Sequence, residues 1–161
     1  MYSEQSLRQQ KKILHLVDKN QNNRVFIPQK FLATDEDIEY IERKMGGKLP
    51  LSYKWFIKTL GAGGVGESFV EGVGTEKDRY TIVKDSKDLM QILGLDAPTL
   101  FLGLYKEGCL SLLSLCDEEC EDSSVSVLQE TLKDTLNYND TYKRFSSFYH
   151  YLLDIYKTYS V

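Results

Sequence analysis

Two apolar runs flank a short polar turn between Thr99 and Cys116, and this pattern predicts a β-sheet. The first run reads TLFLGLY (99–105), the turn reads KEG, and the second run reads CLSLLSLC (109–116). Apolar runs of this length on either side of a turn predict two adjacent strands. The second run is nearly all apolar, which is typical of a strand buried on both faces, so we place it in the centre of its sheet.

Shorter runs elsewhere in the chain predict further strands. The segments 67–74 and 79–83 have strand-like patterns around the polar turn TEKD, and we predict that they form a hairpin. VSVLQ (125–129) predicts another short strand. RVFIP (24–28) predicts a strand or an extended connector that Pro28 ends.

An amphipathic helix is predicted near the N-terminus, within about residues 4–19. Its apolar residues recur at helical spacing: Leu7, Ile13, Leu14 and Val17. The polar segment DKNQNNR then breaks this periodicity. Residues 1–30 are therefore predicted to form an N-terminal helix and an extended arm.

Start and stop signals predict two further helices before the sheet. Thr34 is followed three residues later by Asp37, which is the pattern of a helix start, and Gly46-Gly47 supplies a stop. Pro50 stands where proline opens a helix. The apolar stripes of these helices comprise Ile38, Ile41 and Met45 in the first, and Tyr53, Phe56, Ile57 and Leu60 in the second.

Two more helices are predicted later in the chain. Ser86 is the expected cap of a short helix that runs to about Leu93 and stops at Gly94. The segment TYKRFSSFYHYLLDIYKTY (141–159) predicts a C-terminal helix that docks through a broad apolar face. That face comprises Phe145, Phe148, Tyr149, Leu152, Ile155, Tyr156 and Tyr159.

The order of these elements predicts an α+β fold. Helices come first, hairpins follow and a helix closes the chain, so we expect a twisted antiparallel sheet flanked by helices. Residues 1–161 fit one domain with a single core, and neither a repeat nor a low-complexity linker divides them.

The charge distribution favours a basic protein partner. The chain is net −4, but residues 1–30 carry six basic residues against Glu4 and Asp18, so the remainder is net −8. Nucleic-acid affinity rests largely on cationic groups, which this acidic remainder lacks. Because the apolar runs are too short to span a bilayer and the start has no apolar signal core, we expect no membrane partner and a cytoplasmic location.

The glycine-rich stretch LGAGGVGE (60–67) contains the spacing G-x-G-x-x-G of a dinucleotide-binding loop. Such a loop lies between a strand and a helix whose N-terminal amides bind phosphate. Here a predicted helix precedes the glycines and strand-like sequence follows them, so we predict a helix-to-strand turn. An enzyme that uses this loop and nearby acids remains the enzymatic alternative.

The other chemical motifs predict no cofactor, no metal site and no catalytic residue. The three cysteines, Cys109, Cys116 and Cys120, are an odd number and are expected to be free thiols. Cys116 and Cys120 would supply only two metal ligands, and neither histidine is near them in the sequence. His15 and His150 stand beside no nucleophile motif, so we do not expect an enzyme.

An acidic run between the strands at 109–116 and 125–129 is the sharpest candidate for a binding site. Its members are Asp117, Glu118, Glu119, Glu121 and Asp122. Two interpretations stay open: a solvated loop that keeps a sheet edge soluble, or a site that attracts a basic partner. A calcium site is disfavoured because the spacing departs from that of an EF-hand loop.

The segment from Asp37 to Gly64 resembles the SUKH superfamily, which includes bacterial immunity proteins of polymorphic toxin systems and fungal cell-wall synthesis regulators. The family pattern is a helix of the type I-E-x-x-E-x-x-x-G, then L-P-x-x-Y-K-x-F, then a glycine-rich segment. This pattern falls on Ile41, Glu42, Gly46 or Gly47, Leu49, Pro50, Tyr53, Lys54, Phe56, Gly61, Gly63 and Gly64. The closing RFSSFYHYLL (144–153) is similar to the family's last helix, whereas the middle of the chain departs from the better-known pattern.

The resemblance implies an α+β fold and a protein that binds a partner without performing chemistry. The implied partner is a cognate protein toxin, often a nuclease, which is neutralised stoichiometrically. The acidic chain agrees with a basic toxin. The alternative implied by the fungal relatives is a regulatory scaffold that binds endogenous proteins.

Overall fold

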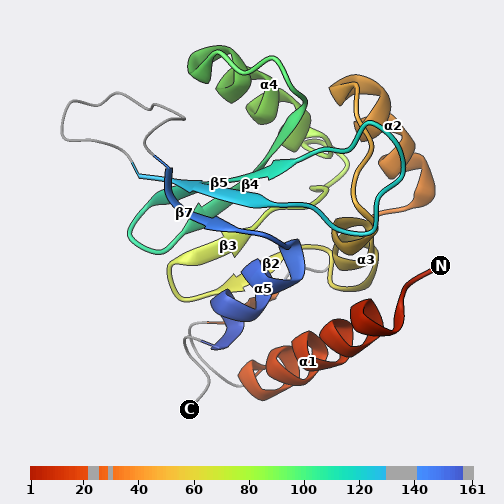
Figure 1. Cartoon of the computed structure of the whole chain (residues 1–161), viewed down its shortest axis with the longest axis vertical. Coiled ribbons are helices and arrows are strands. Elements are labelled where there is room, and N and C mark those ends of the chain that lie inside the picture. The colour runs from red at the N-terminus through yellow and green to blue at the C-terminus, as the bar shows by residue number, and fades with distance from the viewer. Residues whose placement is uncertain (22–25, 29–30, 130–140, 158–161) are drawn as a thin grey trace.

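In the part of the chain that the structure describes, seven strands form one antiparallel sheet whose spatial order is the order of the chain (Figure 1). This structure is a computed structural model that describes residues 1–21, 26–28, 31–129 and 141–157. The strands are β1 (Phe26–Pro28), β2 (Gly63–Val65), β3 (Ser68–Val70), β4 (Thr99–Tyr105), β5 (Cys109–Ser114), β6 (Val125–Leu128) and β7 (Thr141–Phe145). The helices are α1 (Glu4–Asn20), α2 (Asp35–Met45), α3 (Leu51–Thr59), α4 (Thr81–Leu93) and α5 (Phe148–Lys157). The predicted α+β class is confirmed.

The two apolar runs form the adjacent strands β4 and β5, as predicted, and the predicted central position of β5 in the sheet is confirmed. They pair from Thr99 and Ser114 to Tyr105 and Cys109, on either side of the turn 106–108. The short strands β2 and β3 pair on one side of them, and β6 and β7 on the other. The described part of the predicted extended arm, β1, pairs with β2 at the edge of the sheet.

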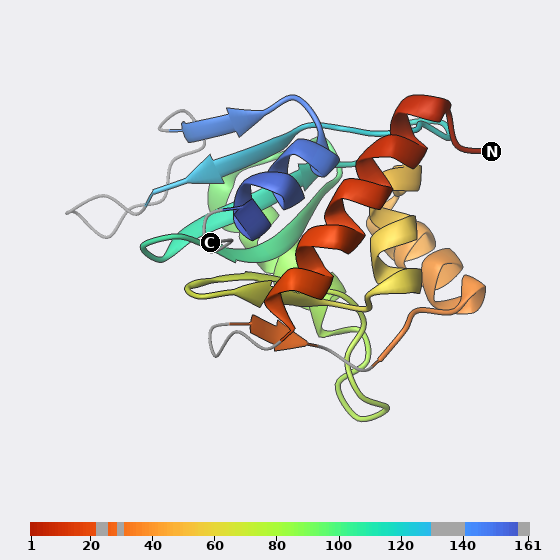
Figure 2. The same ribbon diagram turned by 90° about the horizontal axis from the view of Figure 1, so that it is seen from below.

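Helices cover both faces of this sheet. α4 lies over one face, and α5 lies on the other with α1 packed against it (Figures 1 and 2). α2 and α3 lie together at one end of the strands in both views. The main core is rich in large aromatic side chains that are fully buried, among them Tyr53, Phe56, Phe148, Tyr151 and Tyr156.

The local helix signals around α2 and α3 are confirmed. The Thr34 hydroxyl accepts a hydrogen bond from the Asp37 backbone amide, while the Asp37 carboxylate accepts one from the Thr34 amide, so the two residues form a capping box. Gly46 ends α2 in the left-handed conformation, with φ of 73°. Pro50 is the N-cap residue of α3.

The predicted hairpin over 67–83 is wrong. β3 pairs with β2 and β4, and the segment 79–83 leads into α4, which begins at Thr81. Ile82, Ser86 and Leu89 form part of the buried side of that helix, so tertiary burial overrides the strand preference of β-branched residues. Ser86 is therefore not a cap. Ser86 lies in the middle of α4, and its hydroxyl accepts a hydrogen bond from the Phe101 amide of β4 at 2.8 Å.

Two predicted helix faces also need correction. The buried residues of α1 include Gln10, Ile13 and Val17, whereas Leu7 and Leu14 are 47% and 40% exposed. Polar residues take the inner positions because they find partners there, as Gln10 does when it donates to the Tyr149 hydroxyl at 2.9 Å. At the C-terminus, Phe145 was predicted to lie on the helical face, but it is the last residue of β7. The helix α5 begins only at Phe148. Tyr159 lies outside the described residues.

The expectation of three free thiols is wrong for two of the cysteines. Cys116 and Cys120 form a disulfide bond, with their Cα atoms 6.2 Å apart, a separation typical of disulfides. Cys109 is a free, buried cysteine of β5. An odd count is equally compatible with one pair and one free thiol, so counting alone did not decide the matter.

Candidate functional site

The turn between α2 and α3 is organised by the carboxylate of Glu42. Its Oε2 atom accepts a hydrogen bond from the Leu49 amide at 2.8 Å and lies 3.3 Å from the Lys54 ammonium. Lys48 approaches the other carboxylate oxygen at 4.0 Å. The Glu42 side chain is only 10% exposed, and a buried charge is stable when it is paired in this way. Glu42 and Lys54 of the family pattern thus hold two consecutive helices together.

The apolar residues of the family pattern belong to the core. Ile41, Leu49, Tyr53 and Phe56 are fully buried. The Tyr53 hydroxyl donates to the carbonyl oxygen of Glu71 at 2.8 Å, which links α3 to the segment after β3. Burial raises the pKa of Tyr53 well above its usual value, so this phenol stays protonated and acts as a donor. These residues position the fold and are not available to a ligand.

The glycines of the pattern allow close contact between backbones. Gly61 has a φ of 82° directly after α3, and its amide donates to the Phe56 carbonyl. Gly63 and Gly64 lie in β2, where Gly64 pairs with Phe69 of β3. A strand follows this stretch and a helix precedes it, as predicted. The helix N-terminus that a dinucleotide loop offers to phosphate is therefore not formed after these glycines.

The acidic run divides into an exposed half and a half whose carboxylates are hydrogen-bonded to other elements. Asp117, Glu118 and Glu119 are exposed. Glu121 instead accepts hydrogen bonds at Oε1 from the Ser3 amide at 2.7 Å and from the Ser6 hydroxyl at 2.6 Å, which ties the run to the start of α1.

Asp122, the last member of the run, holds two helix starts. Its carboxylate accepts hydrogen bonds from the Ser52 hydroxyl of α3 at 2.7 Å and from the Phe148 amide of α5 at 2.9 Å. The Ser147 hydroxyl donates to its second oxygen. A carboxylate at a helix N-terminus is favourable because it satisfies free amides and faces the positive end of the dipole. This arrangement explains why α5 begins at Phe148.

The exposed half of the run is fixed to the α2–α3 turn by its backbone. Lys48 and Cys116 exchange two backbone hydrogen bonds, of 2.7 and 2.8 Å. The Leu51 amide donates to the Cys120 carbonyl at 2.9 Å. The disulfide between the two cysteines closes a loop that contains Asp117, Glu118 and Glu119. We call residues 116–120, with these three exposed acids, the acidic ring.

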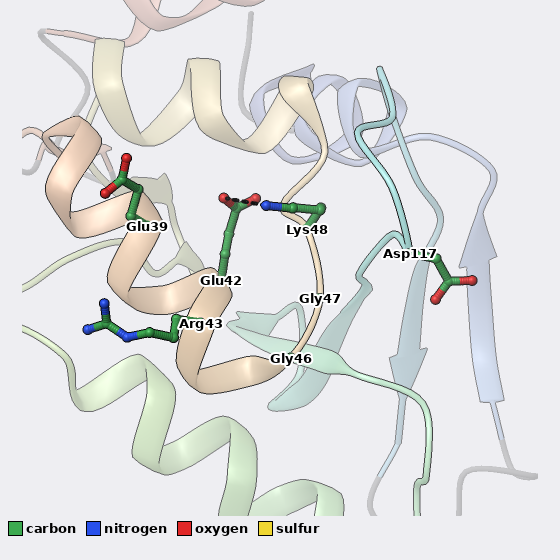
Figure 3. A pocket seen from close by; sticks show the side chains of 7 residues that line it. All are labelled: Glu39, Glu42, Arg43, Gly46, Gly47, Lys48 and Asp117. Atoms are coloured by element: carbon green, nitrogen blue, oxygen red, sulfur yellow. Dashed lines mark ion pairs between the residues drawn. The ribbon is translucent and has the colours of Figure 1, made fainter.

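A pocket of about 550 Å³ lies between the acidic ring and α2 (Figure 3). It is lined by Glu39, Glu42, Arg43, Gly46, Gly47, Lys48 and Asp117. Residues of the family pattern and the first acid of the ring therefore share one concave surface. The lining offers both carboxylates and cationic side chains, which can pair with charged groups of either sign.

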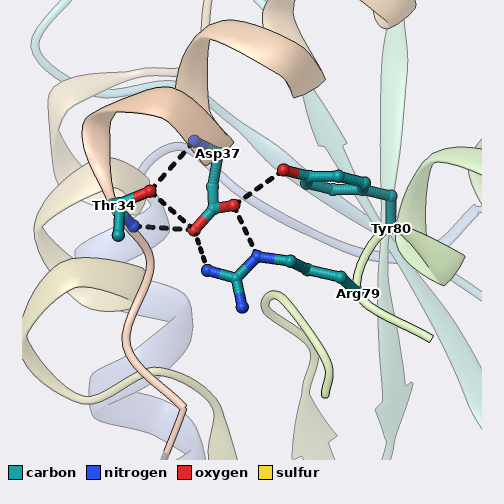
Figure 4. A network of polar contacts seen from close by, with 4 residues as sticks. All are labelled: Thr34, Asp37, Arg79 and Tyr80. Carbon is teal, nitrogen blue, oxygen red and sulfur yellow. Dashed lines mark hydrogen bonds and ion pairs between the residues drawn. The ribbon is translucent and has the colours of Figure 1, made fainter. Parts of the chain in front are cut away.

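Sequence reasoning missed a polar network that joins α2 to the start of α4 (Figure 4). Arg79 donates to both oxygens of Asp37, from Nε at 2.7 Å and from a terminal nitrogen at 2.5 Å. The Tyr80 hydroxyl donates to the same carboxylate at 2.8 Å. Burial alone would raise the pKa of Asp37, but the hydrogen bonds from Arg79, Thr34 and Tyr80 outweigh it and hold the pKa well below its usual range. The capping box was the only sequence signal at this position.

No membrane-crossing helix is found among the described residues, since none of them forms a helix that is both long and apolar enough. The same residues contain no group of three or more His, Cys, Asp or Glu side chains arranged to hold a metal ion.

The contact between Glu121 and α1 gives a pH-dependent prediction. Hydrogen bonds from Ser3 and Ser6 lower the pKa of Glu121 to about 2. Because the folded-state pKa lies below the unfolded value of about 4.3, the contact stabilises the fold above pH 4 and is lost as the pH falls toward 2. The difference in unfolding free energy between the native chain and Glu121→Gln should therefore shrink over this range. A difference that stays constant down to pH 2 would contradict this role.

The match to a known family spans most of this architecture. A family model described as SMI1-KNR4 cell-wall, SUKH_5, matches residues 13–157, from within α1 to the end of α5. The matched region includes the α2–α3 turn, the glycine-rich strand and the acidic ring. The chain therefore belongs to the SUKH superfamily, within its SMI1-KNR4 cell-wall family.

Proposed function

We propose that this chain is a stoichiometric immunity protein that binds a basic protein toxin through the acidic ring. The observation that carries the proposal is that Asp117, Glu118 and Glu119 are exposed while the backbone on either side of them is held in place. Membership of the SUKH superfamily supports a non-enzymatic binding role. The adjacent pocket would receive charged side chains of the partner.

Ordering a flexible segment on binding costs free energy, so a surface that is already rigid binds a partner with a smaller loss of entropy. The acidic ring is closed by the Cys116–Cys120 disulfide, exchanges two backbone hydrogen bonds with Lys48 and accepts one from the Leu51 amide. Its three carboxylates are therefore presented before a partner arrives. Clustered negative charge of this kind accelerates association with a basic surface and opposes the approach of an acidic one.

The family description favours a second candidate function. The family model is described as SMI1-KNR4 cell-wall. Together with the resemblance to fungal cell-wall synthesis regulators, this description points to a scaffold that binds endogenous proteins. Such a scaffold would use the same surface but would not rescue cells from a toxin. Coexpression with the toxin-like product of a neighbouring gene separates the two: growth rescue and copurification support immunity, and the lack of both rejects it.

Neutralising the acidic ring tests the role of its charge. In the variant Asp117→Asn/Glu118→Gln/Glu119→Gln, association with the basic toxin domain should slow by about tenfold at low ionic strength, and its salt dependence should flatten. Dissociation should change less, because exposed charges act mainly on the encounter. Stopped-flow measurements over a salt series give both rates.

A matched control removes the same amount of charge elsewhere. Asp18, Glu76 and Asp88 are exposed residues at the far end of α1, before α4 and on α4. Their replacement by Asn, Gln and Asn should leave the association rate within about twofold of the native value. An equal loss in both variants would show that only net charge matters and would remove the acidic ring from the interface.

A further inference from the structure

The disulfide of the acidic ring lies at the surface of the protein. Cys116 and Cys120 are both partly exposed, and the three residues that they enclose are exposed acids. The remaining cysteine, Cys109, is only 2% exposed, and burial raises its pKa. We therefore expect a small thiol reagent to reach the paired cysteines of the folded chain more readily than Cys109.

The conformation of the ring does not depend on the disulfide alone. Backbone hydrogen bonds join Cys116 to Lys48 and Cys120 to Leu51, and the Ser52 amide donates to the Glu121 carbonyl at 3.0 Å. A disulfide that closes so short a loop restrains the unfolded chain less than one that closes a long loop. Opening the bond should therefore leave the fold in place, which is the condition for reversible exchange in the native state.

The enclosed acids determine which thiols can attack. Exchange requires a thiolate to reach one of the two sulfurs, so access and charge control its rate. Asp117, Glu118 and Glu119 place up to three negative charges within the same five-residue loop. These charges repel a thiol that carries an additional anionic group and attract one that carries a cationic group.

We propose that Cys116 and Cys120 are a redox-modification site that reacts preferentially with neutral and cationic thiols, because the acids of the ring slow the attack of anionic thiols. The thiolate of the reductant attacks one sulfur, the disulfide breaks, and the other cysteine leaves as a thiolate that takes a proton from water. A second thiolate of the reductant then attacks the reductant's own sulfur in the mixed disulfide, and the attached cysteine leaves as a thiolate that takes the second proton. The protein gains two electrons and two protons, and the reductant becomes a disulfide.

The test compares three thiols on the full-length native chain purified without reductant. Cysteamine is cationic, 2-mercaptoethanol is neutral and 2-mercaptoethanesulfonate is anionic. Alkylation followed by mass spectrometry counts the cysteines opened over time, with the modified positions identified by peptide mapping. The neutralised variant Asp117→Asn/Glu118→Gln/Glu119→Gln serves as the reference, because dividing each rate by the rate on that variant removes the intrinsic reactivity of the thiol.

We expect both ring cysteines to become alkylated without unfolding, while Cys109 stays unmodified. At low salt the normalised rate for the cationic thiol should exceed that for the anionic thiol by about five- to tenfold, and the ratio should approach one in 1 M salt. The Asp18/Glu76/Asp88 control variant should keep the ratio of the native chain.

Three results would overturn the proposal. One is a purified chain with three titratable thiols that forms no disulfide when an oxidised dithiol is added. Another is reduction that proceeds only at the rate of global unfolding, measured by circular dichroism. The third is a normalised rate that does not depend on the charge of the thiol. None of these measurements involves a protein partner, so their outcome is separate from the test of the proposed immunity function.

Discussion

Replacing Asp37 by alanine is expected to lower the unfolding free energy by about 3 kcal/mol, measured by urea denaturation at pH 7. The Asp37 side chain is 3% exposed and accepts hydrogen bonds from the Thr34 amide and hydroxyl, from two Arg79 nitrogens and from the Tyr80 hydroxyl. The variant leaves these donors without their acceptor and removes the capping box of α2. Arg79 is partly exposed and can regain water, which keeps the loss at the lower end for a buried pair.

Asp35 provides the matched control for this prediction. It lies two residues earlier at the start of α2, where its carboxylate accepts a hydrogen bond from Lys58 at 2.7 Å, but its side chain is 82% exposed. An exposed pair contributes little because water screens it, so Asp35→Ala should lower the unfolding free energy far less than Asp37→Ala does. Equal losses for the two variants would show that helix-start charge, and not the buried network, carries the effect.

The same network predicts how stability changes in acid. The pKa of Asp37 is held well below its usual range by its hydrogen bonds, so the folded state binds a proton less readily than the unfolded state. Its contribution is complete above the unfolded pKa of about 4 and is lost as the pH falls further toward the folded value. The difference in unfolding free energy between the native chain and Asp37→Ala should be constant from about pH 5 to pH 7 and should decrease below pH 4.

Gly64→Ala is expected to be the most damaging single change to the glycine-rich stretch. A Cβ atom at this position would overlap the carbonyl oxygen of Ser68 and lie 2.7 Å from the Cα atom of Phe69. These are backbone atoms of the paired strand β3, so no side chain can move away. We expect a loss of about 3 kcal/mol or more in unfolding free energy, or failure to fold at 37 °C.

Gly108→Ala separates this steric effect from the general cost of replacing glycine. Gly108 has a φ of 75° in the turn between β4 and β5, and a Cβ atom there would meet nothing within 4 Å. Its replacement should cost about 1–2 kcal/mol from the left-handed conformation alone. If Gly64→Ala cost no more than Gly108→Ala, close packing of β2 on β3 would not explain the glycines of the family pattern.

Local chemistry explains the elements that could be predicted. Thr34 and Asp37 form a helix start through bonds that span three residues, and Gly46 ends the helix through its own backbone freedom. The run of β5 is nearly all apolar, which favours a central position in the sheet. These signals depend on neighbours in the sequence, and all of them appear in the structure.

The predictions that were wrong concern segments whose structure is decided by a contact with a residue far away in the sequence. The segment 79–83 has strand-forming residues, but Arg79 and Tyr80 are bound by Asp37 and the following residues form α4, whose inner side packs on the sheet. Phe145 has the spacing of a helical residue, but Asp122 caps α5 only from Phe148 onward. Neither partner is visible from the local pattern, because each lies tens of residues away.

In the acidic run, some features could be predicted from the sequence and others became clear only from the fold. Its composition predicted a surface of negative charge, and three of its acids are exposed on the acidic ring. Only the fold revealed that Glu121 and Asp122 bind the starts of α1, α3 and α5, and that Cys116 and Cys120 are paired. Their use in a complex stays a prediction that the neutralised variants test.

The sequence by itself thus determined the fold class, the central strand β5, both ends of α2, the start of α3 and the SUKH resemblance, because periodicity, turn residues and capping act over a few neighbouring residues. The tertiary structure alone decided which side of α1 is buried, where α4 begins, and which acids of the acidic run are exposed. Those outcomes depend on hydrogen bonds and packing between segments such as Ser3 and Glu121, or Asp37 and Arg79, which are brought together only when the chain folds.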